Sequence, residues 1–279
     1  MTETQKNPLI AKMQRVVQGT TIRLPSKGLF YDNGELREDV IDGQVVVYPM
    51  ATLDEIIIRS PDMLLQGTAV EQVLGRCVPQ ILKPSAILSK DVDYLLVMLR
   101  KISYGDKTTI PFTCPICDEK AQEKGEKAES HDYPLSMSYF VNNSKEIEAE
   151  AIQSNYTLTL ENSMVIHLRP STFAEMVKMF GIEDTKMTAE EIEDVVLSSI
   201  LSVIKDVDGI KDREIVKEWL HAIPVSVKNE IIGQISNANN FGPTFSYVIT
   251  CVDCKKEHDI NYILNPVSFF TLPSKPKTE

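Results

Sequence analysis

Five cysteines are the residues of this chain whose spacing could do chemistry, and four of them form two C-x-x-C pairs. The pairs are Cys114 with Cys117 and Cys251 with Cys254, and each is preceded by an apolar residue and a threonine. A two-residue gap lets two thiolates bind one ion, and two such pairs complete a tetrahedral zinc site with Zn–S distances of about 2.3 Å. The matching contexts of the pairs therefore predict a single four-cysteine Zn2+ site.

A four-cysteine zinc site leaves no coordination position for water or substrate, so its predicted role is structural rather than catalytic. Two histidines are alternative ligands: His258 follows Cys254 by four residues, and His131 lies between the two pairs. A thioredoxin-like redox function is disfavoured, because it requires one reactive pair that opens a helix in a βαβ unit. Both pairs here are instead predicted to end strands.

The fifth cysteine, Cys77, lies on a stripe of apolar residues at helical spacing. Free cysteines in such a stripe are usually small core residues. An odd number of cysteines, and an N-terminus unlike a secretory signal, argue against a disulfide framework and for a reducing cytoplasm. We therefore predict metal binding for the two pairs and core packing for Cys77.

Composition and charge exclude several classes of function. The chain has 279 residues, of which 43% are hydrophobic, and no apolar run approaches the roughly 20 residues of a membrane helix. The net charge is -11 and no basic run occurs, so neither nucleic acid nor a membrane is a predicted partner. An enzyme is not predicted, because the common catalytic motifs are absent and acidic pairs such as Asp91 and Asp93 are simply helix-start charges.

Strands are predicted to lead into both cysteine pairs. Residues 109–118 form a short extended piece that enters the first pair, and residues 119–131 are so highly charged that they predict a solvated loop. Residues 245–250 predict a strand before the second pair, and residues 256–262 can return as its partner. A further strand is predicted at the valine-rich residues 43–50.

Helices are predicted for most of the remaining chain. Residues 51–104 predict three short helices and residues 171–240 predict several more, while residues 156–169 between them predict a β-hairpin. Thr-x-x-Glu sequences are typical of the capping box at a helix start. Four of them occur, beginning at Thr52, Thr68, Thr172 and Thr188.

The elements together predict an α+β fold of mixed helices and small antiparallel sheets, in which a zinc-ribbon-like pair of four-cysteine knuckles closes a mainly helical insertion. The predicted parts are an N-terminal arm (1–20), a strand-plus-helices domain (21–107), the first zinc knuckle with a β segment (108–170), the helical insertion (171–240), and the second knuckle with the C-terminal tail (241–279). The arm is too short to fold alone, so it either frays or orders against a partner. Because metal binding would contribute to folding, chelation is expected to loosen the knuckles and the insertion.

Several segments, in their order along the chain, resemble the baseplate hub and hub-assembly proteins of T-even-like contractile-tailed phages. They are LPSKGLFY, VVVYPMATLDE, SPDMLLQGTAVEQVLGRCVP, DVDYLLVMLRKISYGD, CPIC, CVDC and NPVSFF. The resemblance implies a viral protein made in the host cytoplasm that helps to build the tail baseplate, either as a virion subunit or as an assembly chaperone that leaves. It implies other baseplate and tail proteins as partners, leaves a homo-oligomer open, and carries over no catalytic residue. Some family members are shorter, so residues 1–20 and part of 171–240 are expected to serve a function particular to this chain.

Two other classes of function compete with this interpretation. A zinc-ribbon transcription or adaptor protein would bind nucleic acid or a polymerase, which the acidic charge and the lack of a basic patch disfavour. An enzyme with a zinc-stabilised lid would need a constellation of polar catalytic residues, and the sequence shows none.

Overall fold

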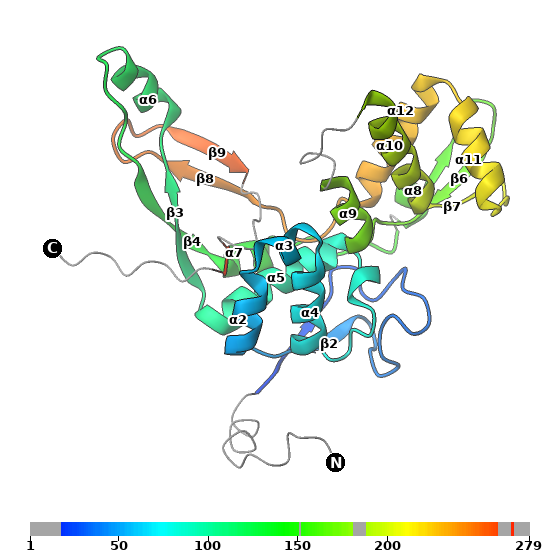
Figure 1. Cartoon of the computed structure of the whole chain (residues 1–279), viewed down its shortest axis with the longest axis horizontal. Helices are drawn as coiled ribbons and strands as arrows, with labels where there is room; N and C mark the ends of the chain where they lie inside the picture. Colours follow the sequence, from blue (N-terminus) through cyan, green and yellow to red (C-terminus); the bar gives the residue numbers. More distant parts are fainter. Residues whose placement is uncertain (1–17, 151, 181–187, 262–268, 271–279) are drawn as a thin grey trace.

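The structure is a computed structural model that describes residues 18–150, 152–180, 188–261 and 269–270. Figure 1 shows three parts: a central body of helices, an arm of β-hairpins that projects from it, and a lobe of helices and strands on the other side. The strands form three antiparallel pairs and one three-stranded antiparallel sheet within the described residues. This confirms the predicted α+β class of mixed helices and small antiparallel sheets.

The body is built around α5 (Ser89–Tyr104), a helix of 16 residues. Its buried residues Val92, Leu95 and Leu99 recur at the spacing of one helix face and lie in the main hydrophobic core. Around α5 lie β1 (Thr20–Arg23) paired with β2 (Gln44–Val47), and α2 (Thr52–Ile58), α3 (Pro61–Leu65), α4 (Thr68–Cys77), the 3-10 turn η2 (Pro84–Ala86) and α7 (Met137–Asn142).

Residues 51–104 contain one more α-helix than predicted. Pro61 begins α3 directly after α2, and Gly67 separates α3 from α4 in the left-handed conformation, with φ +74°. A Cβ atom at Gly67 would lie 2.7 Å from Val177, so the close packing also requires glycine there. The predictions of a strand at β2 and of a buried Cys77 are confirmed.

Two of the four predicted capping boxes form as expected and two do not. At Thr172 and Thr188 the box forms, because the glutamate three residues later accepts the threonine N–H at 2.8 and 2.7 Å. The prediction is wrong at Thr52, because α2 is capped one residue earlier and Asp54 supplies the carboxylate. It is also wrong at Thr68, whose hydroxyl donates to a backbone carbonyl instead.

The lobe has a hydrophobic core of its own. Its sheet has the order β5-β6-β7, and the predicted hairpin is confirmed as its first two strands. Buried residues of the sheet, among them Ile166 and Leu168, pack against Ile200 and Ile231 of the helices. The elements are α8 (Ile152–Tyr156), β5 (Thr157–Thr159), β6 (Val165–Leu168), α10 (Ala189–Val203), β7 (Ile204–Val207), α11 (Arg213–Ala222) and α12 (Val225–Ala238). Helix α9 (Phe173–Phe180) links the lobe to the body, because Phe173 is buried in the main core.

The arm consists of two hairpins that come from distant parts of the sequence. They are β3 (Lys107–Phe112) with β4 (His131–Ser136), joined through α6 (Pro115–Gln122), and β8 (Ser246–Thr250) with β9 (Glu257–Asn261). The second pair confirms the predicted strands around Cys251. The predicted loop over 119–131 is wrong in its first part, because α6 continues to Gln122.

The arm and the lobe are both joined to the central body (Figure 1). Phe269 and Phe270, from the NPVSFF segment, are buried in the main core. No helix in the described ranges is long and apolar enough to span a membrane. The predicted N-terminal arm lies outside the described residues up to residue 17, and the predicted domain boundaries remain predictions.

Candidate metal centre

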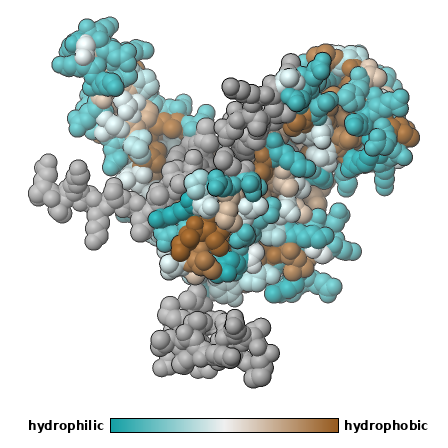
Figure 2. All heavy atoms as spheres, in the orientation of Figure 1, coloured by the Kyte–Doolittle hydropathy of each residue, from teal (hydrophilic) through white to brown (hydrophobic). Residues whose placement is uncertain are grey.

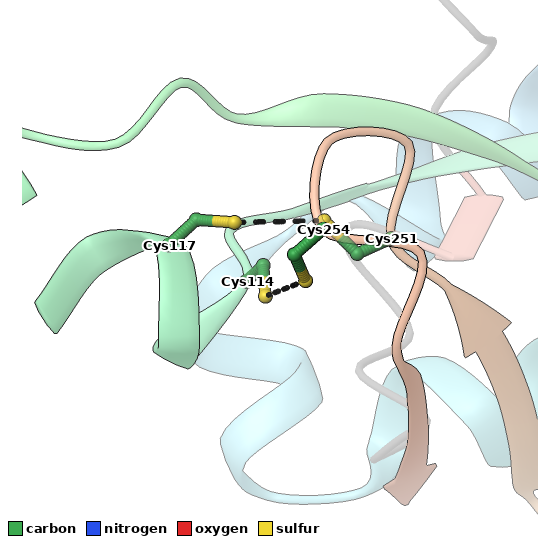
Figure 3. Close-up of side chains that lie close together, drawn as sticks. All are labelled: Cys114, Cys117, Cys251 and Cys254. Carbon is green, nitrogen blue, oxygen red and sulfur yellow. Dashed lines mark hydrogen bonds between the residues drawn. The ribbon is translucent and has the colours of Figure 1, made fainter. Parts of the chain in front are cut away.

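The four paired cysteines come together in the arm, although 133 residues separate Cys117 from Cys251. Figure 3 shows their sulfurs facing one another between the two hairpins. The Sγ atoms of Cys114 and Cys254 are 3.7 Å apart, those of Cys117 and Cys251 are 3.8 Å apart, and all four lie within 4.8 Å of one another. The sequence prediction that two distant pairs form one cluster is confirmed.

These distances fit a tetrahedral metal site. Four sulfurs held about 2.3 Å from a central ion lie about 3.8 Å from one another, which matches both measured pairs. The same distances are far longer than the bond of about 2.05 Å in a disulfide. The cluster is therefore arranged to hold one metal ion, and its four sulfurs would complete a tetrahedral coordination shell.

The first cysteine pair is positioned by the start of a helix. Cys114 is the N-cap of α6 and Cys117 lies in its first turn, with Pro115 at the first helical position. Proline suits this position because its fixed φ is helical and its missing N–H needs no partner. The first pair thus follows strand β3, as predicted, but Cys117 lies in the first turn of a helix that the sequence analysis did not predict.

A helix start is also where a thioredoxin-like redox pair would lie, but the surroundings here differ. Helix α6 joins two antiparallel strands, β3 and β4, and does not belong to a βαβ unit. The second pair also supplies two more sulfurs within the same cluster. Both features favour metal coordination over disulfide exchange.

The second pair lies in a tight turn between β8 and β9. The N–H of Lys255 donates to the carbonyl of Cys251 at 3.0 Å, and Lys255 adopts a left-handed φ of +59°. Backbone N–H groups of Cys254 and Asp253 point at the Cys251 sulfur and lower the pKa of Cys251 to about 6. The turn therefore favours a thiolate before any metal binds.

The pKa values of two thiols in the cluster shift in opposite directions. Desolvation and the three neighbouring thiols raise the pKa of Cys117 to about 12, the opposite direction from Cys251. Several thiolates within a few ångströms repel each other unless a cation lies between them. A divalent cation would remove this repulsion and favour four thiolates at once.

The two candidate histidine ligands lie outside the group of four sulfurs. His258 lies beside it, with Nε2 3.2 Å from the Cys114 sulfur and its ring packed against Phe112 at 5.5 Å between centroids. His131 is paired elsewhere, since its Nε2 lies 3.0 Å from a carboxylate oxygen of Asp253. His258 is therefore placed as a hydrogen-bonding neighbour of the site.

Aromatic residues that the sequence analysis did not identify join the two hairpins near the site. The hydroxyl of Tyr133 in β4 accepts the N–H of Val252 at 3.1 Å, and the hydroxyl of Tyr247 in β8 donates to the carbonyl of Pro134 at 3.0 Å. The Tyr133 ring packs edge-on against Phe112, with centroids 5.9 Å apart. No spacing rule points to these residues, because their partners come from the other hairpin.

A closed cluster of four cysteines on a projecting arm is typical of a structural metal site, and this fold and site define a protein whose arm carries four cysteines positioned to hold one metal ion. The family model described as T4 bacteriophage base plate protein matches residues 41–271, and the chain belongs to this family. The matched range includes all four cysteines and the whole lobe. Searches of curated proteins and of solved structures find no significant match. The family confirms the resemblance to baseplate proteins of T4-like phages.

Proposed function

We propose that the chain acts at the hub of a phage contractile-tail baseplate, as a hub subunit or as a chaperone of hub assembly, through contacts with other tail proteins and without a catalytic step. Membership of a structural baseplate family supports this proposal. The observation that carries it is the closed four-sulfur cluster, because such a site stabilises an arm and offers no position to a substrate.

The metal in this proposal is Zn2+, held by Cys114, Cys117, Cys251 and Cys254. Zinc prefers four thiolate ligands in tetrahedral geometry, and the sulfur–sulfur distances of 3.7 and 3.8 Å support this assignment. Its role would be to hold the two hairpins together, so that metal-binding energy becomes part of the stability of the arm.

Elemental analysis of the purified full-length chain tests the metal assignment. One zinc per chain is expected in the wild type, and a large loss is expected in Cys117→Ser and in Cys254→Ser. Cys77→Ser is the matched control, because Cys77 is a buried thiol of the body outside the cluster. A wild-type chain that binds no zinc, or a Cys254→Ser variant that keeps it, would contradict the proposal.

The arm offers a surface for contacts with another tail protein. It projects from the body (Figure 1), and its second hairpin exposes Val248 on β8 and Val252 in the knuckle. Exposed apolar side chains on a rigid projection favour a protein partner over a solvated role. In this proposal the metal fixes the shape of the surface that the partner recognises.

Quantitative mass spectrometry of purified particles and of the producing lysate distinguishes the two roles at the hub. A fixed copy number per particle that follows the baseplate symmetry would indicate a subunit. Abundance in the lysate with absence from particles would indicate an assembly chaperone. Enrichment on nucleic acid or RNA polymerase, with no association with particles or their precursors, would contradict both roles.

A further inference from the structure

The two hairpins of the arm differ in how their outer edges are protected. In the first hairpin, the N–H of Met137 donates to the carbonyl of Asp106, and this bond fixes which positions of β3 and β4 direct their backbone groups outward. Pro111 of β3 and Pro134 of β4 both fall on outward positions, where a proline has no N–H to offer to another strand. Proline therefore protects both edges of the first hairpin.

The second hairpin has no proline in either strand. The N–H of Cys251 donates to the carbonyl of Lys256, so the ladder directs the backbone groups of Ser246, Val248 and Thr250 away from β9. Among the described residues, no strand pairs with this side of β8.

Strand β8 also lacks protection by charge. Its five residues, SYVIT, carry no charged side chain, and Val248 at the centre is 50% exposed. The outward positions of β9 include Glu257 and Asp259 instead, and charges on an edge strand oppose further pairing. Figure 2 shows hydrophilic surface at the tip of the arm, over α6, and patches of hydrophobic and neutral surface between the tip and the body. Of the four strand edges in the arm, that of β8 is the one best suited to accept another strand.

The sequence of β8 is symmetric in character about Val248. If two copies of β8 paired antiparallel on a two-fold axis at this residue, Val248 would lie opposite the same residue of the second copy, and Ser246 would lie opposite Thr250. Pairs of β-branched residues and pairs of hydroxyl residues are both favourable across strands. No charge in the strand opposes the approach of a second copy, although the whole chain carries -11.

We propose that two copies of the chain associate through their arms, by antiparallel pairing of β8 with β8 about a two-fold axis at Val248. The pairing would join two two-stranded hairpins into one larger sheet, which is more stable than an isolated pair of strands. It rests on the proposed function in taking the arm as a contact surface, and it names a second copy as the partner on this edge. Because one strand pair is a small interface, the association is reversible and depends on concentration.

Sedimentation velocity of the full-length, zinc-loaded chain over a range of concentrations tests the proposal. The wild type should pass from monomer to dimer as its concentration rises. Val248→Lys places like charges opposite each other at the axis, and it should raise the Kd of the dimer about tenfold. Val225→Lys is the matched control and should leave the Kd unchanged, since Val225 is 66% exposed but lies in the lobe. Zinc content is measured in both variants, so that a loss of dimer can be separated from a loss of fold.

A pair of double variants tests the direction and register of the pairing. Ser246→Lys with Thr250→Lys would place lysine opposite lysine at both ends of the paired strands. Ser246→Lys with Thr250→Glu would place lysine opposite glutamate at both ends, so its dimer should be about tenfold tighter than that of the first double variant. Equal Kd values for the two would contradict an antiparallel register centred on Val248.

Two further outcomes would overturn the proposal. A zinc-loaded wild type that stays monomeric at every concentration would leave the β8 edge to a strand of another tail protein. Undiminished dimerisation of Val248→Lys would place the contact on a different surface. Neither result contradicts the role at the baseplate, because that role fails only if the chain has no association with particles or their precursors.

Discussion

The lobe and the arm are stabilised in different ways. In the lobe, strands and helices enclose a separate hydrophobic core around residues such as Ile166 and Ile231. In the arm, each sheet has only two strands, its buried apolar residues such as Tyr133 and Ile249 belong to the main core of the body, and two of the cysteines, Cys114 and Cys251, are themselves buried. Isolated two-stranded pairs are marginally stable at best. Among the described residues the arm has no hydrophobic core of its own, and a four-cysteine cluster lies between its two hairpins.

Metal removal should produce the largest difference between the two regions. A chelator under reducing conditions should lower hydrogen-exchange protection in β8 and β9 by more than about 100-fold, because structural zinc contributes about 10 kcal/mol or more to the folding of small zinc domains. Protection in β6 and α10 should change little. Hydrogen-exchange mass spectrometry measures both regions in one sample. The separate core of the lobe thus changes the sequence-based expectation that chelation also loosens the whole insertion, and equal losses in both regions would contradict the comparison.

A mutation that creates a cavity in the lobe should have the opposite effect, because it should destabilise the lobe and leave the arm unchanged. Ile231→Ala removes a side chain that is 0% exposed, and the expected loss is about 2–5 kcal/mol in the free energy of unfolding of the lobe. Trp219, the single tryptophan, packs against this core, so its fluorescence during denaturant unfolding reports on the lobe. Zinc content should not change. The matched control is Ile232→Ala, at a position that is 42% exposed, and a similar loss there would argue against a cavity effect.

The body contributes a pH dependence that neither the arm nor the lobe core predicts. Asp91 is fully buried in α5, where its carboxylate accepts the N–H of Ser26 at 3.0 Å and the hydroxyl of Tyr31 at 2.6 Å. Burial raises the pKa of Asp91 to about 6, above the value of about 3.9 in an unfolded chain. The native state therefore holds the proton more tightly, and the unfolding free energy falls by on the order of 2 kcal/mol as the pH rises from about 4 to about 6.

Asp91→Asn should remove this pH dependence. The variant keeps an acceptor for the Ser26 N–H and loses the one for the Tyr31 hydroxyl. Its free energy of unfolding should therefore be lowered by a constant amount that does not change with pH. Two titratable groups face Asp91, namely Tyr31 and Tyr156. Both stay neutral in this pH range, because burial raises the pKa of each. Denaturant unfolding of variant and wild type at pH 4.5 and 7 measures the difference, in which effects of pH on zinc binding cancel. An Asp62→Asn control should keep the wild-type slope, and an unchanged slope in Asp91→Asn would contradict the assignment.

The features that the sequence predicted are those that local spacing determines. Cys114 and Cys117 are separated by the spacing of a metal-binding pair wherever the fold places them, and the strands before Cys251 and after Cys254 follow from alternation and turn residues. The joining of two pairs into one cluster was predictable because a single pair leaves a zinc ion half coordinated.

The features that the sequence did not predict depend on distant elements that meet in space. Asp91 fits a helix-start charge in the sequence. Its partners Tyr31 and Ser26 lie 60 and 65 positions away along the chain, and their hydrogen bonds make Asp91 a buried anchor of the loop after β1. His167 shows no partner in sequence and lies 2.9 Å from Asp206, which the pairing of β6 with β7 brings beside it. Helix α6 was missed because its charged residues are those of a solvated loop, and only Pro115 marks its start.

The smallest predicted effect concerns the hydrogen bond that ties the second knuckle to β4. Tyr133→Phe keeps the packing against Phe112 and removes the acceptor of the Val252 N–H, which should cost about 1 kcal/mol. In the arm this loss should appear as a zinc affinity lowered by up to about tenfold in a competition assay with a chelator dye, because folding and metal binding are coupled there. In the lobe, Thr188→Ala removes the N-cap of α10 at a similar cost of about 1 kcal/mol, but it should leave the zinc affinity unchanged and shift only the Trp219 unfolding curve. If Thr188→Ala lowered the zinc affinity as much as Tyr133→Phe did, the arm and the lobe would fold as one unit, and the distinction between them would fail.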